Sequence, residues 1–444
     1  MSFKTDRQTL DELNLLGKFR NGSVYHLFNQ LKTRGGEQLM DEMFRNPLTD
    51  TDSINRRSSI FHFFQHQTFS FPFDVQQVAL MREYLDAADS GSALMMLLRT
   101  AGKKLLSGLT RDERYRKSIQ GLQATIVTLR NLQRMVQELK TFNGPFAKRV
   151  AAIARILELP EMEKLSGIDI YQALPLRTLA HYEHLLKSSL HKEMEDVFLF
   201  ICELDLYITV SDVARAKGFA YATALPPESN ILSVKNLKHP CVPLAVGNDL
   251  ELQQNNNVLF LTGANMAGKS TLMKAMAIGL YLAHMGFPVA ADQCRFSVRE
   301  GLYTSINVAD NIGLGYSHFY AEVVRVKQAA EAAAGGHRLM LIFDELFKGT
   351  NVKDAYDGTL AVTEAFAEYA DCLFVVSTHI IEVGEALKHL DNIQFRYLPT
   401  VMDGNKPTYT YRLEKGITED RQGMLIIRNE GILEMISNKH SAGA

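Results

Sequence analysis

A glycine-rich turn lies within the sequence LFLTGANMAGKSTLMKAM, residues 259–276, and carries residue types that bind phosphate. Gly263, Gly268, Lys269 and Ser270 have the spacing G-x-x-x-x-G-K-[ST]. Glycines allow successive backbone N–H groups to point into one concavity, and the helix that follows adds its positive N-terminal end. Lys269 would bind the β- and γ-phosphates of ATP, and Ser270 would place its hydroxyl on Mg²⁺. The alternative is a strand-turn-helix corner that fits the spacing by accident.

Two strand ends further along the chain argue against an accident. The sequence RLMLIFDELFKGTN, residues 338–351, is an apolar strand that ends in Asp344 and Glu345. A phosphate-binding loop needs a neighbouring strand with one carboxylate in the Mg²⁺ shell and, in hydrolases, a second carboxylate that orients water. The next strand, CLFVVSTHI, leads to His379, at the edge of the sheet where ligands collect in open α/β folds. Alone, His379 would be read as a hydrogen-bonded strand end, but beside the other two motifs it is expected to contact the γ-phosphate or the attacking water.

Between these strands, Ser317 precedes a helical pattern that ends at Gly335 and Gly336. A serine at an uncovered helix N-terminus is a candidate anion site. The simpler alternative is an ordinary helix cap, and nothing in the neighbouring sequence excludes it.

The elements that must position these residues follow from the apolar pattern. Short apolar runs alternate with helical patterns from about residue 231 onward, at 258–262, 339–343 and 373–377. This alternation predicts an α/β domain with a mostly parallel sheet.

The region before about residue 220 has a mostly helical apolar pattern. Apolar residues recur three and four positions apart, most clearly in one long amphipathic helix from Ile119 to Leu139. A proline-rich break at 223–230 separates this region from the strands. We therefore expect a helical domain at 1–228, followed by an α/β domain with the phosphate-binding loop at 229–444.

Composition limits the class of protein. Lys and Arg number 48 and Asp and Glu 50, so the total charge does not indicate a nucleic-acid partner. The four cysteines have neither C-x-x-C nor zinc-site spacing, and we expect reduced thiols. The first residues are polar and acidic, and no apolar run reaches membrane-spanning length. These features predict a soluble cytoplasmic protein without a membrane partner.

A basic zone is hidden within the balanced total. Residues 99–155 hold thirteen Lys and Arg against three Asp and Glu. Such a zone suits backbone-led DNA binding through counterion release, whereas the alternative is a solvated helix face. Aromatic residues are sparse there, so stacking on single strands is the less favoured mode. The candidate nucleic-acid contacts are Lys103, Lys104, Arg114, Arg116, Lys117, Arg130 and Arg134.

In order, the sequences TGANMAGKSTLM, SHFYAE, DELFKGTN and STH resemble the ATPase of the MutS family of DNA mismatch repair proteins, a branch of the ABC-type ATPases. The pair Asn265 and Met266 inside the phosphate loop resembles a trait of this family, and LKHPCV at 237–242 resembles the segment that precedes the loop. Residues 13–60 and 203–226 resemble the two ends of the MutS core domain.

The resemblance implies roles for the motif residues. ATP would lie against the loop and Ser317, and Mg²⁺ would be held by Ser270 and Asp344. Glu345 would polarise the attacking water, His379 would sense the γ-phosphate, and Lys269 would act with them. Because the family's signature helix closes the site of a partner subunit, Ser317 would act in trans and a homodimer is implied. The implied nucleotide-binding residues are Gly263, Ala264, Asn265, Met266, Ala267, Gly268, Lys269, Ser270, Thr271 and Ser317.

Departures from the family pattern limit the function that is expected. The sequence begins directly at the core, so domains that read mismatches and connect them to the core are expected to be missing. Near residues 244–246 the family often has an aromatic residue that stacks on adenine. This sequence has Leu244, Ala245 and Val246 there, which predicts loose base selectivity.

We therefore expect an ATPase that couples ATP binding and hydrolysis to double-stranded or branched DNA, in repair or recombination, without reading mismatches. The alternatives are an ATPase that acts on ribosomes or other nucleoproteins, and a nucleotide-dependent scaffold that does not hydrolyse ATP. The intact Asp344, Glu345 and His379 argue against the scaffold.

Overall fold

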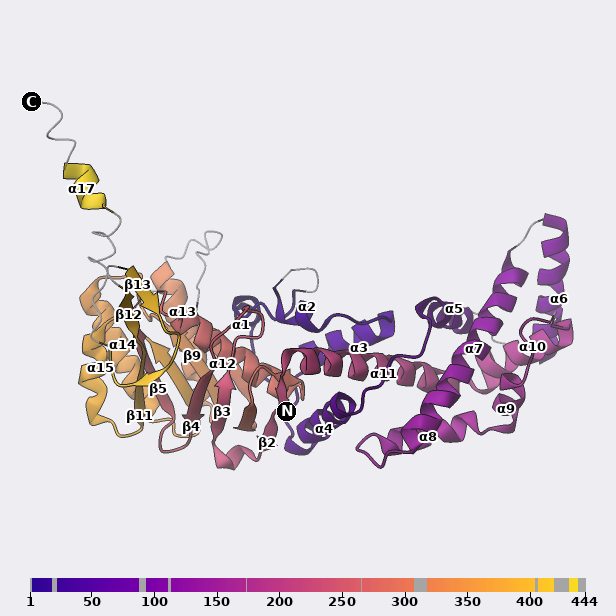
Figure 1. Cartoon of the computed structure of the whole chain (residues 1–444), viewed down its shortest axis with the longest axis horizontal. Coiled ribbons are helices and arrows are strands. Elements are labelled where there is room, and N and C mark those ends of the chain that lie inside the picture. The colour runs from indigo at the N-terminus through magenta and orange to yellow at the C-terminus, as the bar shows by residue number, and fades with distance from the viewer. Residues whose placement is uncertain are drawn as a thin grey trace, which may run out of the picture. The chain divides into compact units, whose positions relative to one another are not determined.

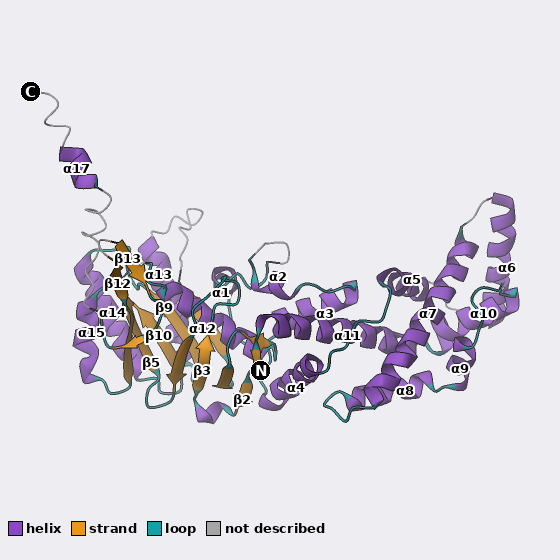
Figure 2. Cartoon of the chain, in the orientation of Figure 1, coloured by secondary structure: helices purple, strands orange, loops and turns teal. Residues whose placement is uncertain are grey.

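The chain divides into two compact units in a computed structural model. The structure describes residues 2–17, 22–87, 93–110, 113–172, 174–264, 266–306, 318–403, 406–418 and 431–437. The first unit, called the sheet unit here, comprises residues 1–27, 44–58 and 214–444; the second, called the helical unit, comprises 28–43 and 59–213. Figure 1 labels their elements and Figure 2 distinguishes helices from strands.

The main sheet of the sheet unit is mostly parallel. Its strand order is β14-β11-β5-β10-β9-β8, and every pair is parallel except β11 with β14. A second sheet has the order β2-β7-β3-β4. The strands are β1 (Ala220–Tyr221), β2 (Thr223–Leu225), β3 (Leu232–Leu237), β4 (Asn248–Leu252), β5 (Val258–Gly263), β6 (Pro288–Val289), β7 (Gln293–Ser297), β8 (Gly301–Ser305), β9 (Leu339–Asp344), β10 (Leu373–Ser377), β11 (Ile393–Leu398), β12 (Thr400–Asp403), β13 (Lys406–Tyr409) and β14 (Glu414–Lys415).

The central strands β5, β9 and β10 are apolar and buried throughout because helices cover both faces of the sheet. Side chains such as Phe260, Phe343 and Phe374 pack on one face against α13, α14 and α15. Helix α12 contacts β5, β8 and β9 (Figure 1). The helices of this unit are α1 (Arg7–Glu12), α12 (Lys269–His284), α13 (His318–Ala334), α14 (Val352–Ala367), α15 (Ile381–Ala386) and α17 (Ile432–Ser437). The expected α/β domain with a mostly parallel sheet is confirmed.

The helical unit contains the expected long helix, which is α7. Its apolar stripe, including Leu122, Ile126 and Leu129, is buried. At Gly121 the helix approaches α5 closely, because a Cβ there would lie 2.5 Å from the Cβ of Tyr84. The helices of this unit are α5 (Val75–Asp86), α6 (Ala93–Thr110), α7 (Arg114–Lys140), α8 (Ala147–Leu157), α9 (Pro160–Ser166) and α10 (Leu176–His184), with a π-helical turn at Leu185–Ser189.

Other helices have residues in both units. They are α2 (Val24–Phe28), α3 (Arg34–Arg45), α4 (Thr51–His66) and α11 (His191–Lys217). Within the helical unit, buried Asp205 of α11 accepts hydrogen bonds from the backbone N–H and the hydroxyl of Thr33, both at 2.7 Å. A Cβ on Gly35 would lie 2.3 Å from Sγ of Cys202, so α3 and α11 pack too closely for any larger residue there. Among the described residues, no helix is both long and apolar enough to cross a membrane.

The protein should lose stability at acidic pH because of His284, which is fully buried at the end of α12. Its Nδ1 lies 2.7 Å from the carbonyl oxygen of Leu48, and its Nε2 accepts from the backbone N–H of Arg299 at 3.2 Å. These two contacts fit the neutral ring with the proton on Nδ1. Burial lowers the pKa of His284 to about 4 from an ordinary 6.5, with the charge of Arg299 acting in the same direction.

Between these two pKa values the unfolded state binds a proton that the folded state excludes. We therefore expect full stability above about pH 6.5 and a progressive loss toward pH 4, of up to about 3 kcal/mol. Chemical unfolding at several pH values measures this loss. His239 titrates in the same range, so the comparison is with a His284→Gln variant, which should lose stability less steeply. An equal slope in that variant would assign the loss to other groups.

Candidate nucleotide site

The register of the sheet brings the three motif-bearing strand ends together. Ser377 of β10 pairs with Leu261 of β5 on one side and with Asp344 of β9 on the other. Because all three strands are parallel, the segments that follow them leave the same edge of the sheet. The glycine-rich turn, the Asp344–Glu345 pair and His379 therefore converge, as the sequence predicted.

The turn between β5 and α12 has a backbone that requires glycine. Gly263 and Gly268 have φ values of 147° and 101°, and Met266 between them has 74°. A Cβ on Gly263 would also lie 3.1 Å from the carbonyl oxygen of Leu398. Helix α12 begins directly after Gly268 and directs its free N–H groups toward the turn. Such a turn has the features of an anion site.

Lys269 lies across the turn. Its Nζ donates hydrogen bonds to the carbonyl oxygens of Gly263 at 2.8 Å and Ala264 at 3.2 Å. The side chain is buried, and this burial lowers its pKa although the charges of Asp344 and Glu345 act in the opposite direction. A buried ammonium group therefore stands at the base of the turn.

The donor set next to Lys269 fits Mg²⁺. Ser270 donates a hydrogen bond from its hydroxyl to one carboxylate oxygen of Asp344, and Ser377 donates to the other. A hydroxyl and a carboxylate are hard oxygen ligands, and Mg²⁺ commonly takes one or two from the protein and the rest from phosphate and water. Ser377 was not assigned a role from the sequence, although it stands in the STH motif.

Glu345 follows Asp344 in a backbone conformation that is rare for a residue with a side chain, with a φ of 51°. Its backbone N–H donates to the carbonyl oxygen of Ser377 at 2.8 Å, which fixes the turn against β10. Its two carboxylate oxygens lie 3.8 Å from Nδ1 of His379 and 3.9 Å from Nζ of Lys348. The structure thus brings together the carboxylate and the histidine that were expected to act on water and phosphate.

A cavity of about 710 Å³ opens beside the turn and includes the residues from Met266 to Leu272 and Glu345 in its lining. Its volume falls in the range of small-molecule and cofactor sites. Burial and the nearby charge of Lys274 lower the pKa of His239, also in the lining, to about 4, so its ring is neutral at pH 7.

Tyr411 supplies an aromatic ring to this cavity, which sequence reasoning missed. It has a φ of 56°, and its ring carbon lies 3.0 Å from where a Cβ of Gly268 would stand. Asn248 holds the segment in place: its amide donates to the carbonyl oxygen of Tyr411 at 2.9 Å and accepts from the N–H of Leu413 at 2.7 Å. The cavity is therefore lined both by residues 244–246, which are not aromatic, and by an aromatic side chain from a distant part of the chain.

Two of the nucleotide-site candidates, Asn265 and Ser317, lie outside the described residues. Helix α13 begins at His318, directly after Ser317, and Gly335 and Gly336 follow its last residue. The predicted end of that helix is therefore confirmed, and the predicted cap at Ser317 lies outside the described residues.

The candidate nucleic-acid contacts of the helical unit differ in their contacts within the unit and in their exposure. Nζ of Lys103 lies 3.3 Å from Glu183, which is fully buried. The guanidinium of Arg130 donates to the carbonyl oxygens of Ser166 and Ile168, at the end of α9. These two cations are thus engaged within the helical unit. The remaining candidates are exposed and comprise Lys104, Arg114, Arg116, Lys117 and Arg134.

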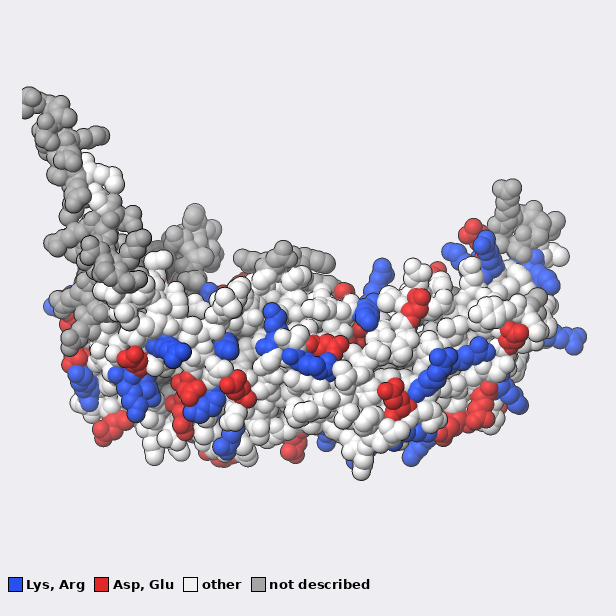
Figure 3. Space-filling view, viewed as in Figure 1, with Lys and Arg blue, Asp and Glu red and all other residues white. Residues whose placement is uncertain are grey.

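Acidic residues from beyond residues 99–155 reduce the charge excess of the basic zone. Lys140 pairs with Glu158 at 2.6 Å, and Arg149 pairs with Asp196 at 2.6 Å and with Glu203 at 2.8 Å. Figure 3 shows Lys and Arg side chains interspersed with acidic ones on the face of the helical unit in view. The zone is therefore less basic in three dimensions than along the sequence.

Residues 259–442 match the family described as MutS domain V. The DNA mismatch repair protein MutS of Lactococcus lactis subsp. lactis (strain IL1403) is 30% identical over 245 residues, which cover 52% of this chain and 28% of the relative. The protein of the same name from Leuconostoc mesenteroides subsp. mesenteroides is 24% identical over 536 residues, covering 99% of this chain and 62% of the relative.

A third relative, the DNA mismatch repair protein MutS of Anaplasma phagocytophilum (strain HZ), is 28% identical over 245 residues, covering 54% of this chain and 29% of its own. The chain thus spans between 28% and 62% of the lengths of these curated relatives. The segment that matches the family contains the glycine-rich turn, both strand-end carboxylates and His379. The chain is therefore similar to the MutS family, through a match of residues 259–442 to MutS domain V and a likeness to a DNA mismatch repair protein MutS over nearly its whole length.

Proposed function

We propose that the sheet unit has a P-loop fold and is an ATPase that uses Mg²⁺. The observation that carries the proposal is the convergence of Lys269, Ser270, Asp344 and Glu345 at one edge of the sheet, beside a cavity of about 710 Å³. A turn with free N–H groups, a buried ammonium group, a hydroxyl–carboxylate pair and a second carboxylate are the groups that phosphoryl transfer requires.

Each residue has a stated task in this proposal. Lys269 would exchange its carbonyl contacts for the phosphates of ATP, and the loop from Gly263 to Thr271 would surround them. Ser270 and Asp344 would hold Mg²⁺, which supplies positive charge to the phosphate oxygens. Glu345 would accept a hydrogen bond from the attacking water and orient it, with His379 next to the γ-phosphate. Tyr411 would form the aromatic wall for the base.

We further propose that ATP binding and hydrolysis are coupled to nucleic acid. The segment 1–228, which supplies the helical unit and also residues 1–27, 44–58 and 214–228 of the sheet unit, would serve as the core or lever domain. Residues 229–444 would serve as the ATPase domain. The helical unit would contact DNA mostly at the phosphate backbone, through exposed cations including Arg116, Lys117 and Arg134. Ser317 of one subunit would complete the site of the other, in a homodimer. The names of the relatives, all DNA mismatch repair proteins, support DNA repair as the setting.

The experiment that tests this function is the rate of ATP hydrolysis with Mg²⁺, alone and with perfect, mismatched and branched duplexes, single strands or ribosomes. Turnover that duplex or branched DNA stimulates supports the proposal. Stimulation by ribosomes alone would favour a nucleoprotein-remodelling ATPase. Nucleotide binding without turnover would favour the scaffold.

DNA binding should weaken with salt and should not discriminate mismatches. If about four to six cations reach phosphates, log K should fall against log salt with a slope of about −4 to −5. Replacing Arg116, Lys117 and Arg134 by glutamine should weaken all DNA forms alike and reduce that slope by up to about three units. Filter binding or fluorescence anisotropy at several salt concentrations measures both.

The matched control replaces Arg295 and Lys388, exposed cations of the sheet unit, by glutamine, and should leave the slope unchanged. A tenfold preference for a mismatched duplex would contradict mismatch-blind binding. A slope that is unchanged in the triple variant would remove these residues from the contact surface.

A further inference from the structure

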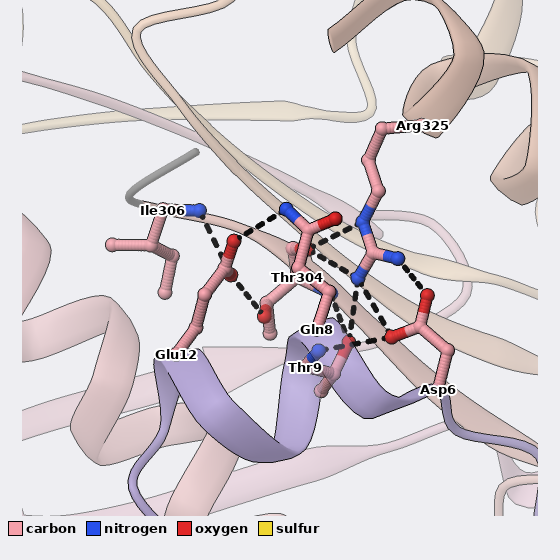
Figure 4. Close-up of polar contacts among 7 residues, drawn as sticks. All are labelled: Asp6, Gln8, Thr9, Glu12, Thr304, Ile306 and Arg325. Atoms are coloured by element: carbon pink, nitrogen blue, oxygen red, sulfur yellow. Dashed lines mark hydrogen bonds and ion pairs between the residues drawn. The ribbon is translucent and has the colours of Figure 1, made fainter. Parts of the chain in front are cut away.

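Arg325 of α13 is a buried cation that has no role yet in the nucleotide site. Its Nε and Nη2 donate to the carbonyl oxygen of Thr304, at 2.9 and 2.7 Å, and Nη2 also donates to the hydroxyl of Thr9 at 2.7 Å. Nη2 donates to one carboxylate oxygen of Asp6 at 2.9 Å, and Nη1 forms an ion pair with the other (Figure 4). This guanidinium therefore joins α13 to the beginning of α1 and to the end of β8.

Helix α1 also holds the end of β8 directly. The hydroxyl of Thr9, which is fully buried, accepts from the backbone N–H of Thr304 at 3.1 Å. Glu12 accepts from the hydroxyl of Thr304 at 2.7 Å and from the backbone N–H of Ile306 at 3.1 Å (Figure 4). One short helix thus fixes β8 and α13 relative to each other. We call this group of residues the α1 clamp: Asp6, Thr9, Glu12, Thr304 and Arg325.

The clamp adds directional contacts to the apolar packing of α13. Val326, Ala329 and Ala333 of this helix lie in the hydrophobic core of the sheet unit. The hydrophobic effect has no direction, so such packing alone specifies the rotation and axial position of a helix only loosely. A guanidinium presents its N–H groups in a fixed plane, and its three acceptors in the clamp can be met together in one placement of the helix. The clamp therefore sets the position of α13.

The first turn of α13 packs on the turn that follows β9. A Cβ on Gly349 would lie 3.1 Å from the backbone nitrogen of Phe319, and the ring centroids of Phe319 and Phe347 are 6.0 Å apart. Phe319 precedes Arg325 by six positions, which is about 9 Å along a helix axis. A shift of α13 at the clamp therefore reaches residues 345–349 through direct packing.

The turn that follows β9 depends on such support because its backbone is strained. Glu345 and Phe347 have positive φ values of 51° and 62°, which are unfavourable for residues with side chains and persist only if the surrounding structure fixes them. The N–H of Glu345 donates to a carbonyl oxygen of β10, and the carbonyl oxygen of Leu346 accepts from the hydroxyl of Thr359 in α14 at 3.1 Å. Packing on Phe319 adds the support of α13, so the place of Glu345 depends on where α13 lies.

We propose that Arg325 is a positioning residue for ATP hydrolysis. Held by Asp6 and Thr9, it places α13 so that the first turn of this helix supports the turn that carries Glu345. This inference rests on the proposed ATPase function. It predicts that a weakened clamp slows the chemical step. The glycine-rich turn and Lys269 connect β5 to α12 and are no part of the clamp, so ATP binding should change little.

The test compares two replacements of Thr9. Thr9→Val keeps the shape of the side chain but removes the acceptor, so that buried N–H groups of Thr304 and Arg325 lose a partner. It should lower kcat about fivefold or more and change KM for ATP less than about threefold. Thr9→Ser keeps the hydroxyl and should keep kcat within about twofold of the wild type. All rates are measured below the onset of thermal unfolding, where a purely destabilised protein would keep its kcat.

Asp6→Asn is a second, independent change in the clamp. Asparagine still caps the N-terminus of α1 and keeps the size of the side chain, but it removes the negative charge opposite Arg325. It should lower kcat at least about threefold, again with little change in KM. The matched control is Asp11→Asn, at an exposed position of the same helix that pairs with Arg7 at 3.7 Å, and it should behave as the wild type.

Amide hydrogen exchange gives a readout that needs no turnover. In Thr9→Val, exchange should accelerate in peptides that cover residues 318–323 and 345–349, while peptides of β5 and β10 keep their protection. Unchanged kcat in both Thr9→Val and Asp6→Asn, an equal loss of kcat in Thr9→Ser and Thr9→Val, or unchanged exchange at 345–349 would each overturn the inference. If Thr9→Val does not fold, Asp6→Asn decides by the same measures. An inactive wild type would instead refute the ATPase proposal, and the exchange comparison would still decide whether the clamp holds the turn.

Discussion

A Glu345→Gln variant is expected to bind ATP as the wild type does and to hydrolyse it at least about a hundredfold more slowly. The carboxylate of Glu345 projects from a turn that is fixed to β10 and lies next to His379 at the edge of the sheet where the phosphates are expected. Glutamine preserves the size and one oxygen of the side chain, but it cannot accept a proton or attract the water hydrogens as a carboxylate does. Single-turnover rates together with equilibrium binding of ATP separate the chemical step from affinity.

The comparison variant is Glu385→Gln, which removes an exposed carboxylate of α15 that pairs with Lys388, and which should turn over ATP normally. If Glu345→Gln hydrolysed ATP at the wild-type rate, another residue would have to orient the water. If it failed to bind ATP, the role of Glu345 in the site would be structural.

Replacing Lys269 by alanine should weaken ATP binding by about ten- to a hundredfold. A hydrogen bond from a charged donor to phosphate contributes about 1.5–3 kcal/mol, and Lys269 is the buried cation at the base of the turn. Burial lowers the pKa of Lys269, so its charge is costly where it stands and its removal should not destabilise the fold. Isothermal titration with ATP measures the affinity, and thermal unfolding checks the fold.

Lys327→Ala, on the exposed side of α13, is the matched control for a lost ammonium group and should bind ATP as the wild type does. Unchanged affinity in Lys269→Ala would contradict the assignment of the turn as a phosphate site. Mixing Lys269→Ala with Ser317→Ala extends the test to the proposed dimer: partial recovery of activity requires one intact composite site, and no recovery argues against Ser317 acting in trans.

The parts of the site that sequence reasoning could predict are those that follow buried parallel strands. The runs before Gly263, Glu345 and His379 are continuous and apolar because helices cover both faces of the sheet, and such runs are visible without a structure. Since parallel strands end at one edge, the polar residues after them are bound to meet. The long helix α7 was predictable for a related reason, because one face of it is buried over its whole length.

The remaining contacts depend on chain positions far apart, which no local pattern records. Tyr411 reaches the cavity only because Asn248, 163 positions away, holds its segment. In the sequence Glu322 looks like one more polar residue of a helix, but it is buried in the fold. The charge excess of the basic zone could not be predicted for the same reason. Arg149 pairs with Asp196 and Glu203, which lie outside residues 99–155 and so are missing from a count along that segment.

The anchoring of α13 by α1 bears on the order in which the protein assembles. Arg325 bonds to Asp6 and Thr9 across 319 and 316 positions, and Tyr281 bonds to Phe44 across 237. During synthesis the segment that contains α1 therefore has no partner until Arg325, 319 positions after Asp6, has left the ribosome. Contacts of such long range slow folding, because much loop entropy is lost before they form. The carboxylates of Asp6 and Glu12 would keep this waiting segment hydrated until Arg325 arrives, so the ion pair can join α1 to α13 while strands β9, β10, β11 and β14 are still to be made.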